Sequence, residues 1–194
     1  MHYGQLYVNI TTRRATAEDV LSYLKSKKLS AFIVKGPEDF CTICEERCDE
    51  QDTRHISTLL KEITNQFACP AIGMLNHDDD ILAYELWSDG MKVDEYDSCP
   101  GYFSGDESRM KPEGGNAKLL SELMGNGKNT EAIEAVLKAS GDGDEDFVFA
   151  VERHEALAKA VGLPVHTVGY GFRYLSEGEI PEGIKEEDII ISDG

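Results

Sequence analysis

Apolar and polar residues alternate with a period of two along several short stretches of this chain, a pattern that predicts β-strands. In Gly4–Thr12, Leu6, Val8 and Ile10 fall on one face and polar side chains on the other, as expected for a half-buried strand. Further short runs bounded by turn residues predict strands at Ala31–Val34, Phe40–Glu46 and Ala71–Asn76.

Two stretches between these strands carry apolar residues at helical spacing instead. The first follows Thr16, a good N-cap residue, and has acidic residues at Glu18 and Asp19 in its first turn. The second, Asp52–Phe67, is the clearest predicted helix, because its apolar residues all fall on one face. The element order is therefore β-α-β-β-α-β, which is typical of ferredoxin-like folds.

In that topology the fourth strand lies at a sheet edge, where an uncovered strand invites wrong pairing. Two more predicted strands, Ile81–Trp87 and Met91–Tyr96, follow at once and can extend the sheet. We therefore expect an α+β fold: a ferredoxin-like core extended by a β-hairpin to a mainly antiparallel sheet of six strands, with both helices on one face. A three-residue loop at Ser88–Gly90 predicts three facing pairs: Trp87 with Met91, Leu82 with Tyr96, and Asp80 with Ser98.

The second half of the chain has a different predicted structure from the first. Residues 1–103 make the predicted core and meander, and residues 104–194 a mostly helical extension that we expect to pack with the core as one domain. Residues 101–115 have loop composition, three helical segments follow, and residues 141–144 read as an acidic linker between the second and third. A late strand is expected at Val165–Tyr174. The tail from Ser176 can add an edge strand or mediate an oligomer contact.

Charge narrows the range of partners. The chain has 37 acidic and 19 basic residues and a formal net charge of −18, so a nucleic-acid-binding role is not expected. Residues 1–35 are an exception with a net charge of +4, from six cations and two acids. That segment can bind an anion, or its cations can form ion pairs within the fold, which we prefer.

The sequence shows no apolar run long enough to span a bilayer and no secretory leader, so we expect a cytoplasmic protein with no membrane role. Its five cysteines are then expected to be reduced. Cys41 and Cys44 are three apart in a predicted strand and point to opposite faces, which favours structural thiols over a redox or zinc pair.

The densest group of chemically capable side chains lies at one end of the predicted meander. His77, Asp78, Asp80 and Asp97 gather there, and an oxygen-rich rim of this kind can hold Mg²⁺ or Ca²⁺. Aspartate also favours tight turns, and no second acidic motif completes a metal site, so turn formation is the preferred interpretation and no cofactor is expected.

Aromatic residues cluster in the same stretch and can line a ligand pocket or partner surface. The candidates are Tyr84, Trp87, Tyr96 and Tyr102, with Cys99 as the thiol that follows the rim. Alternation places Tyr84 and Tyr96 on one face and Trp87 on the other. Packing within the core is the commoner role for such residues.

The stretches Asn76–Asp80, Asp94–Tyr96 and Ser98–Phe103, with the later Glu152–Glu155, resemble a group of bacterial proteins described only as hypothetical. The resemblance implies a bacterial, cytoplasmic origin and transfers no catalytic residue. Two functions stay open. The first is a non-enzymatic binding or interaction domain for a protein or small molecule, as a monomer or homodimer. The alternative is a metal-dependent hydrolase or phosphoryl-transfer enzyme that uses the acidic rim.

Overall fold

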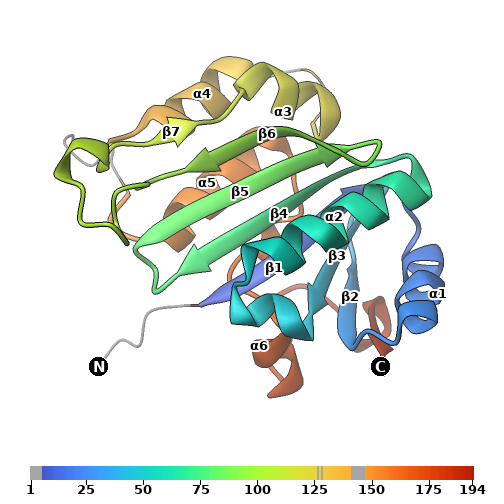
Figure 1. Cartoon of the computed structure of the whole chain (residues 1–194). Helices are drawn as coiled ribbons and strands as arrows, with labels where there is room; N and C mark the ends of the chain where they lie inside the picture. Colours follow the sequence, from blue (N-terminus) through green and yellow to red (C-terminus); the bar gives the residue numbers. More distant parts are fainter. Residues whose placement is uncertain (1–5, 126, 128, 141–146) are drawn as a thin grey trace.

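A computed structural model describes residues 6–125, 127, 129–140 and 147–194. Its centre is one sheet of eight strands in the order β7-β6-β5-β4-β1-β3-β2-β8, with every neighbouring pair antiparallel (Figure 1). The strands are β1 (Tyr7–Arg13), β2 (Ala31–Lys35), β3 (Phe40–Glu45), β4 (Pro70–His77), β5 (Ile81–Ser88), β6 (Met91–Asp97), β7 (Glu113–Gly114) and β8 (Ile189–Ser192).

Six α-helices and four short 3₁₀ helices connect the described strands. The α-helices are α1 (Ala17–Lys27), α2 (Thr53–Phe67), α3 (Ala117–Leu123), α4 (Thr130–Lys138), α5 (Ala150–Val161) and α6 (Phe172–Ser176). The 3₁₀ helices are η1 (Glu46–Glu50), η2 (Glu107–Arg109), η3 (Val165–Thr167) and η4 (Glu186–Asp188). The first part of the chain thus follows the predicted order β1-α1-β2-β3-α2-β4, with η1 before α2.

Side-chain caps define where the first two helices begin. The Thr16 side chain accepts a hydrogen bond from the Asp19 backbone N–H, as the sequence predicts. The Asp52 side chain does the same for Arg54 at the start of α2. Both helices end at a residue in the left-handed conformation, Lys28 and Ala68, whose backbone N–H closes the last turn.

Helices α1 and α2 lie on the same face of the sheet (Figure 1). One core cluster joins their apolar stripes, including Leu24 and Leu60, to inward-facing residues of the sheet such as Ile10, Ile43 and Ala71. Each of these five residues is fully buried. The prediction that both helices cover one face is therefore confirmed.

The opposite face is covered by the C-terminal half. Helices α3, α4 and α5 supply Leu120, Ile133 and Leu157 to a second cluster, which packs against Ile72 and Tyr84 of the sheet. A third cluster joins Leu175 of α6 to strands β2 and β3. As a result, Tyr7–Thr12 of β1 is buried on both faces, and the expectation of a half-buried first strand is wrong.

The hairpin register also differs from the expectation. Ser88 pairs with Met91 across a two-residue turn, in which Asp89 and Gly90 both have positive φ. A bulge between Leu86 and Trp87 then shifts the pairing, so that Tyr84 faces Tyr96. The Ser98 N–H accordingly donates to the carbonyl of Leu82, so Ser98 lies beside Leu82 and not opposite Asp80.

Three further expectations are corrected. The sheet has eight strands where six were expected, because β7 forms within the predicted loop 101–115 and β8 within the tail. Val165–Tyr174 is not a strand: η3 lies there and α6 begins at Phe172. The Asn9 side-chain amide donates to the carbonyls of Thr167 and Tyr170, which holds this segment in a compact conformation. The expected linker 141–144 lies outside the described residues.

Candidate binding groove

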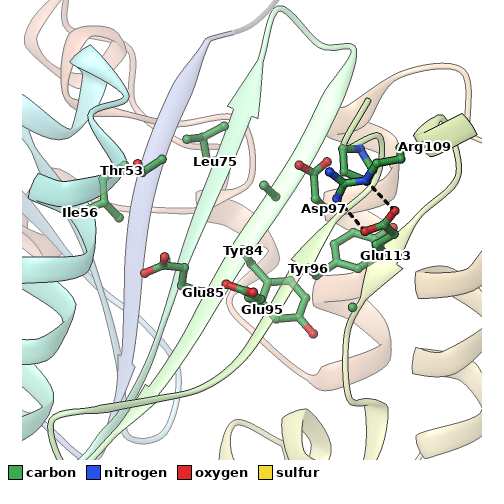
Figure 2. Close-up of a pocket in the computed structure, with 14 residues that line it drawn as sticks. Thr53, Ile56, Leu75, Tyr84, Glu85, Glu95, Tyr96, Asp97, Arg109 and Glu113 are labelled. Carbon is green, nitrogen blue, oxygen red and sulfur yellow. Dashed lines mark hydrogen bonds and ion pairs between the residues drawn. The ribbon is translucent and has the colours of Figure 1, made fainter. Parts of the chain in front are cut away.

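The sheet is wider than helices α1 and α2 together, so β5 and β6 extend beyond α2 on that face (Figure 1). A groove of about 380 Å³ lies there, between α2 and the segment from Pro100 to Gly114. Figure 2 shows Thr53 and Ile56 of α2 on one side of it, and Arg109 with Glu113 on the other. Its size is within the range usual for small-ligand sites, about 300–1,000 Å³.

The floor of the groove is apolar. Leu75 of β4 and Ala83 of β5, which pair across the two strands, form it, with Ile56 on the side of α2. Gly73 lets α2 approach the sheet closely: a Cβ atom there would lie 2.8 Å from Leu60 Cδ1. Leu75 and Ala83 are only partly buried, so apolar surface stays accessible at the base of the groove.

The walls are acidic. Four carboxylates and one guanidinium line the groove: Glu85, Glu95, Asp97, Glu113 and Arg109. Arg109 is paired with Glu113 through two hydrogen bonds of 3.1 and 2.8 Å, which leaves the lining with an excess of negative charge.

Glu85 is held more firmly than the other wall carboxylates. Its Oε2 atom accepts hydrogen bonds from the Ser57 hydroxyl at 2.7 Å and the Trp87 indole N–H at 2.9 Å. The Lys92 ammonium lies 3.4 Å from the Glu85 carboxylate and 2.6 Å from that of Glu95. The ion pair between Lys92 and Glu95 is solvent-exposed, so a cationic group of a ligand can replace Lys92 at little cost in free energy.

Asp97 is partly buried in the wall of the groove. Burial raises the pKa of Asp97 above its ordinary value. The hydrogen bond from the Cys99 N–H and the charge of Arg109 lower that pKa, while Glu113 raises it further. A cation placed in the groove would favour the charged carboxylate, so Asp97 is poised to gain from a cationic ligand.

The acidic rim predicted from the sequence is largely occupied by internal hydrogen bonds. His77 Nδ1 lies 2.7 Å from the Gln51 side-chain oxygen, Asp80 accepts from the Tyr102 hydroxyl at 2.8 Å, and Asp97 accepts from the Cys99 N–H. Of the four predicted metal ligands, His77 and Asp78 lie close together, with Nε2 3.6 Å from Oδ2. In the described part of the chain, no three of His77, Asp78, Asp80 and Asp97 converge as a metal-ligand group.

The predicted aromatic surface is mostly core. Tyr84, Trp87 and Tyr96 are 2%, 9% and 3% exposed, so little of each side chain reaches solvent, although Tyr84 and Tyr96 are among the residues that line the groove (Figure 2). The reason is that α5 packs on one face of β5 and α2 covers part of the other face. Tyr84 and Tyr96 share the α3–α5 side and Trp87 lies on the α2 side, as alternation predicts. Tyr102 is 38% exposed, and Cys99 is partly buried.

The basic N-terminal segment forms ion pairs within the fold. Lys35 contacts Glu18 at 2.7 Å and Lys27 contacts Glu62 at 3.1 Å. Arg13 contacts Asp39 at 3.4 Å. Pairing therefore accounts for these three cations, as preferred from the sequence.

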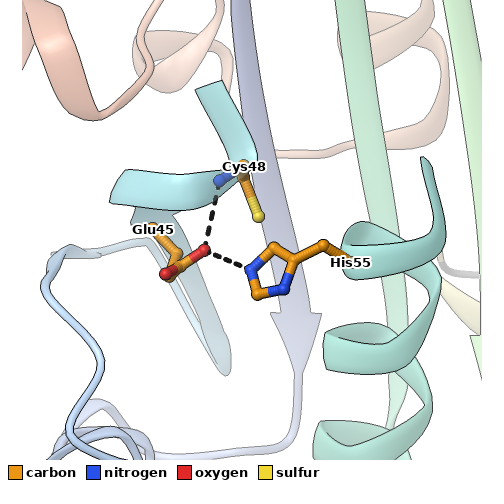
Figure 3. A group of neighbouring side chains, drawn as sticks. All are labelled: Glu45, Cys48 and His55. Atoms are coloured by element: carbon orange, nitrogen blue, oxygen red, sulfur yellow. Dashed lines mark hydrogen bonds and ion pairs between the residues drawn. The ribbon is translucent and has the colours of Figure 1, made fainter. Parts of the chain in front are cut away.

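One constellation was missed in the sequence. Glu45 at the end of β3, Cys48 in η1 and His55 in the first turn of α2 bring their ligand atoms within 4.8 Å of one another (Figure 3). Burial and the neighbouring Glu45 raise the pKa of the Cys48 thiol, which counts against a thiolate nucleophile. The spacing of three and then seven residues gave no signal because it crosses three different elements.

The chain matches no protein-family model and shows no significant similarity to a curated protein or to a solved structure. Among the described residues, no helix combines the length and apolar character needed to cross a bilayer.

Proposed function

We propose that this chain is a cytoplasmic, non-enzymatic binding domain whose groove accepts the basic side chains of a polypeptide partner. The observation that carries the proposal is the combination in one groove of an apolar floor, Leu75 and Ala83, with four wall carboxylates. The net charge of −18 adds long-range attraction for a basic partner and repulsion of nucleic acid.

Lysine and arginine suit such a groove chemically. Each has an aliphatic stem that packs on apolar surface and a charged head that seeks carboxylates. A stem lying over Leu75 and Ala83 would bring its head toward Glu95 and Asp97. A small, purely polar cation would leave the floor unused, and an apolar ligand would leave the carboxylates unpaired.

The scaffold supports the same interpretation. We propose that β1–β4 with α1 and α2 form a ferredoxin-like core, because the strand order β4-β1-β3-β2 and the order of elements agree with that fold. Strands β5 and β6 then serve as an added platform beyond the core, and the groove is built on this platform. On this view the C-terminal helices hold the platform rigid from behind.

The alternative of a divalent-metal enzyme at the acidic rim has weaker support. Asp80 and Asp97 each already accept a hydrogen bond within the protein. An ion would have to gather ligands that do not converge in the described residues. The binding domain needs no such rearrangement.

Fluorescence anisotropy of labelled peptides tests the proposal. A peptide with alternating Lys or Arg and apolar residues should bind, and one with Glu in place of the basic residues should not. The double variant Glu95→Gln, Asp97→Asn should weaken binding roughly tenfold, equivalent to about 1.4 kcal/mol. The amide introduced by Asp97→Asn retains an oxygen that can accept from the Cys99 N–H, so the fold is preserved.

The double variant Glu177→Gln, Glu179→Gln is the matched control, since it also removes two negative charges and both residues are exposed at or just after the end of α6, away from the groove residues. It should leave peptide affinity nearly unchanged. An equal loss of affinity in this control and in the groove variant would mean that overall charge alone attracts the peptide, and the groove would lose its assigned role.

A further inference from the structure

We propose that Glu45, Cys48 and His55 form a zinc-binding site. The three residues are separate from the groove lining, so this inference does not rest on the proposed function. Their ligand atoms already lie within 4.8 Å of one another, and the described residues contain no other such group of three or more.

The donors are positioned by short, well-defined connections. Glu45 ends β3, η1 follows at once with Cys48, and Asp52 caps the helix that carries His55. The Cys48 backbone N–H donates to Glu45 Oε2 at 3.1 Å, which orients the carboxylate. The three donors are thereby held within one short stretch of chain, without a long loop between them.

The observed contacts fit a site in which a proton occupies the place of the ion. His55 Nε2 lies 2.7 Å from Glu45 Oε2, and Figure 3 shows the Cys48 sulfur directed toward the same space. Zinc binds at about 2.0–2.3 Å from nitrogen, oxygen and sulfur donors. Replacing the shared proton by zinc requires the imidazole and carboxylate to separate slightly, without rebuilding the backbone.

Charge and donor type both favour zinc. Glu45 is 1% exposed and Cys48 is 1% exposed, so an ion here is largely removed from water. One carboxylate and one thiolate balance a divalent cation, which reduces the cost of burying charge. Sulfur and imidazole donors suit zinc, whereas Mg²⁺ and Ca²⁺ prefer oxygen alone.

The set supplies three protein ligands, and zinc usually takes four. The His55 side chain is 13% exposed, so the site lies at the border of the core. A water molecule entering beside His55 would complete the coordination. Three protein ligands plus water is the arrangement of zinc sites that stay open to exchange.

Cobalt substitution tests the site directly. The full chain, prepared without a histidine tag, stripped with chelator and kept reduced, is titrated with Co²⁺. We expect one equivalent to bind with visible d–d bands and a near-ultraviolet thiolate-to-cobalt band, both lost when Zn²⁺ is added. Zinc should also raise the melting temperature, because the folded state holds the three donors together and binds zinc more tightly than the unfolded chain does.

Variants identify the ligands. Cys48→Ser should abolish the thiolate band and His55→Gln should weaken cobalt binding at least tenfold, while Cys44→Ser, a buried thiol outside the group, should keep the full spectrum. A thiolate band that persists in Cys48→Ser would overturn the assignment. So would the absence of any such band in the wild-type protein at saturating cobalt, a result that does not depend on any variant folding.

Discussion

The Oδ1 atom of Asp79 accepts a hydrogen bond from the backbone N–H of Val151 at 2.8 Å, across 72 residues of sequence. The Asp79 carbonyl oxygen accepts another from the Ala150 N–H at 2.7 Å. Helix α5 has no side-chain cap bond from its own N-cap residue, Phe149. The turn between β4 and β5 therefore caps α5 from outside and joins the meander to the C-terminal half.

This relationship gives the acidic turn a structural role that can be measured. Asp79→Ala should lower the free energy of unfolding by about 2 kcal/mol, the loss expected for a strong helix cap. Asp78→Ala is the matched control, because Asp78 and Asp79 both have positive φ and suffer the same backbone strain when replaced. Urea denaturation should show the larger loss for Asp79→Ala; equal losses would remove the capping role.

Divalent ions should leave the rim unaffected. Because His77, Asp78, Asp80 and Asp97 do not converge as a ligand group in the described residues, Mg²⁺ and Ca²⁺ at millimolar concentration should produce no rise in melting temperature. Differential scanning fluorimetry measures this directly. A rise with either ion that Asp80→Asn removes would restore the metal-dependent enzyme as the better interpretation.

The buried His154 makes stability depend on pH. Its Nδ1 lies 2.7 Å from the Tyr7 hydroxyl, and burial lowers the pKa of His154 from 6.5 to about 4. The imidazole is then neutral in the folded state, while the unfolded chain takes up a proton below about pH 6.5. The stability that this group contributes is full above about pH 6.5 and is lost as the pH falls toward 4, by about 1.4 kcal/mol per pH unit.

His154→Gln isolates that contribution, since glutamine offers Tyr7 an acceptor but does not titrate. Urea denaturation from about pH 7 to 4 should show a steeper decline for the wild type, with a total difference of about 3 kcal/mol. Parallel curves for the two proteins would show that His154 is not the titrating group.

Arg153 links α5 to the end of α4. It donates to the Tyr96 hydroxyl at 2.9 Å and to the carbonyls of Val136 at 2.9 Å and Ala139 at 2.8 Å. Lysine cannot reproduce this planar set of donors, so Arg153→Lys should cost about 3 kcal/mol in unfolding free energy. Arg54→Lys, at a side chain that is 93% exposed, should change it by less than about 0.5 kcal/mol.

The local pattern of apolar and polar residues was sufficient to predict much of the core. The cap at Thr16 and the helical stripe from Thr53 to Phe67 each agree with the tertiary packing that they serve. Where pattern and packing agree in this way, the sequence predicts the element. The α1–α2 layer and the order of the first six main elements follow from such agreement.

Other features depend on contacts that a local pattern does not contain. The bulge at Leu86–Trp87 shifts the register of the β5–β6 hairpin. Hydrogen bonds from the Asn9 side-chain amide hold the segment Val165–Tyr174 in a compact conformation, although its sequence predicts a strand. The groove combines residues from α2, four strands and the segment before β7. Arg109 in particular lies in a stretch that reads only as loop, so its pairing with Glu113 could not be foreseen.

The groove itself is tested most directly by NMR. Backbone amide shifts of the ¹⁵N-labelled protein are followed while the unlabelled Lys-rich amphipathic peptide is added. We expect the changes to concentrate at Ala83, Glu95 and Gly114, and we expect Ala83→Arg, which places a cation on the groove floor, to remove them. Shifts that centre elsewhere on the sheet, or that survive Ala83→Arg unchanged, would contradict the account.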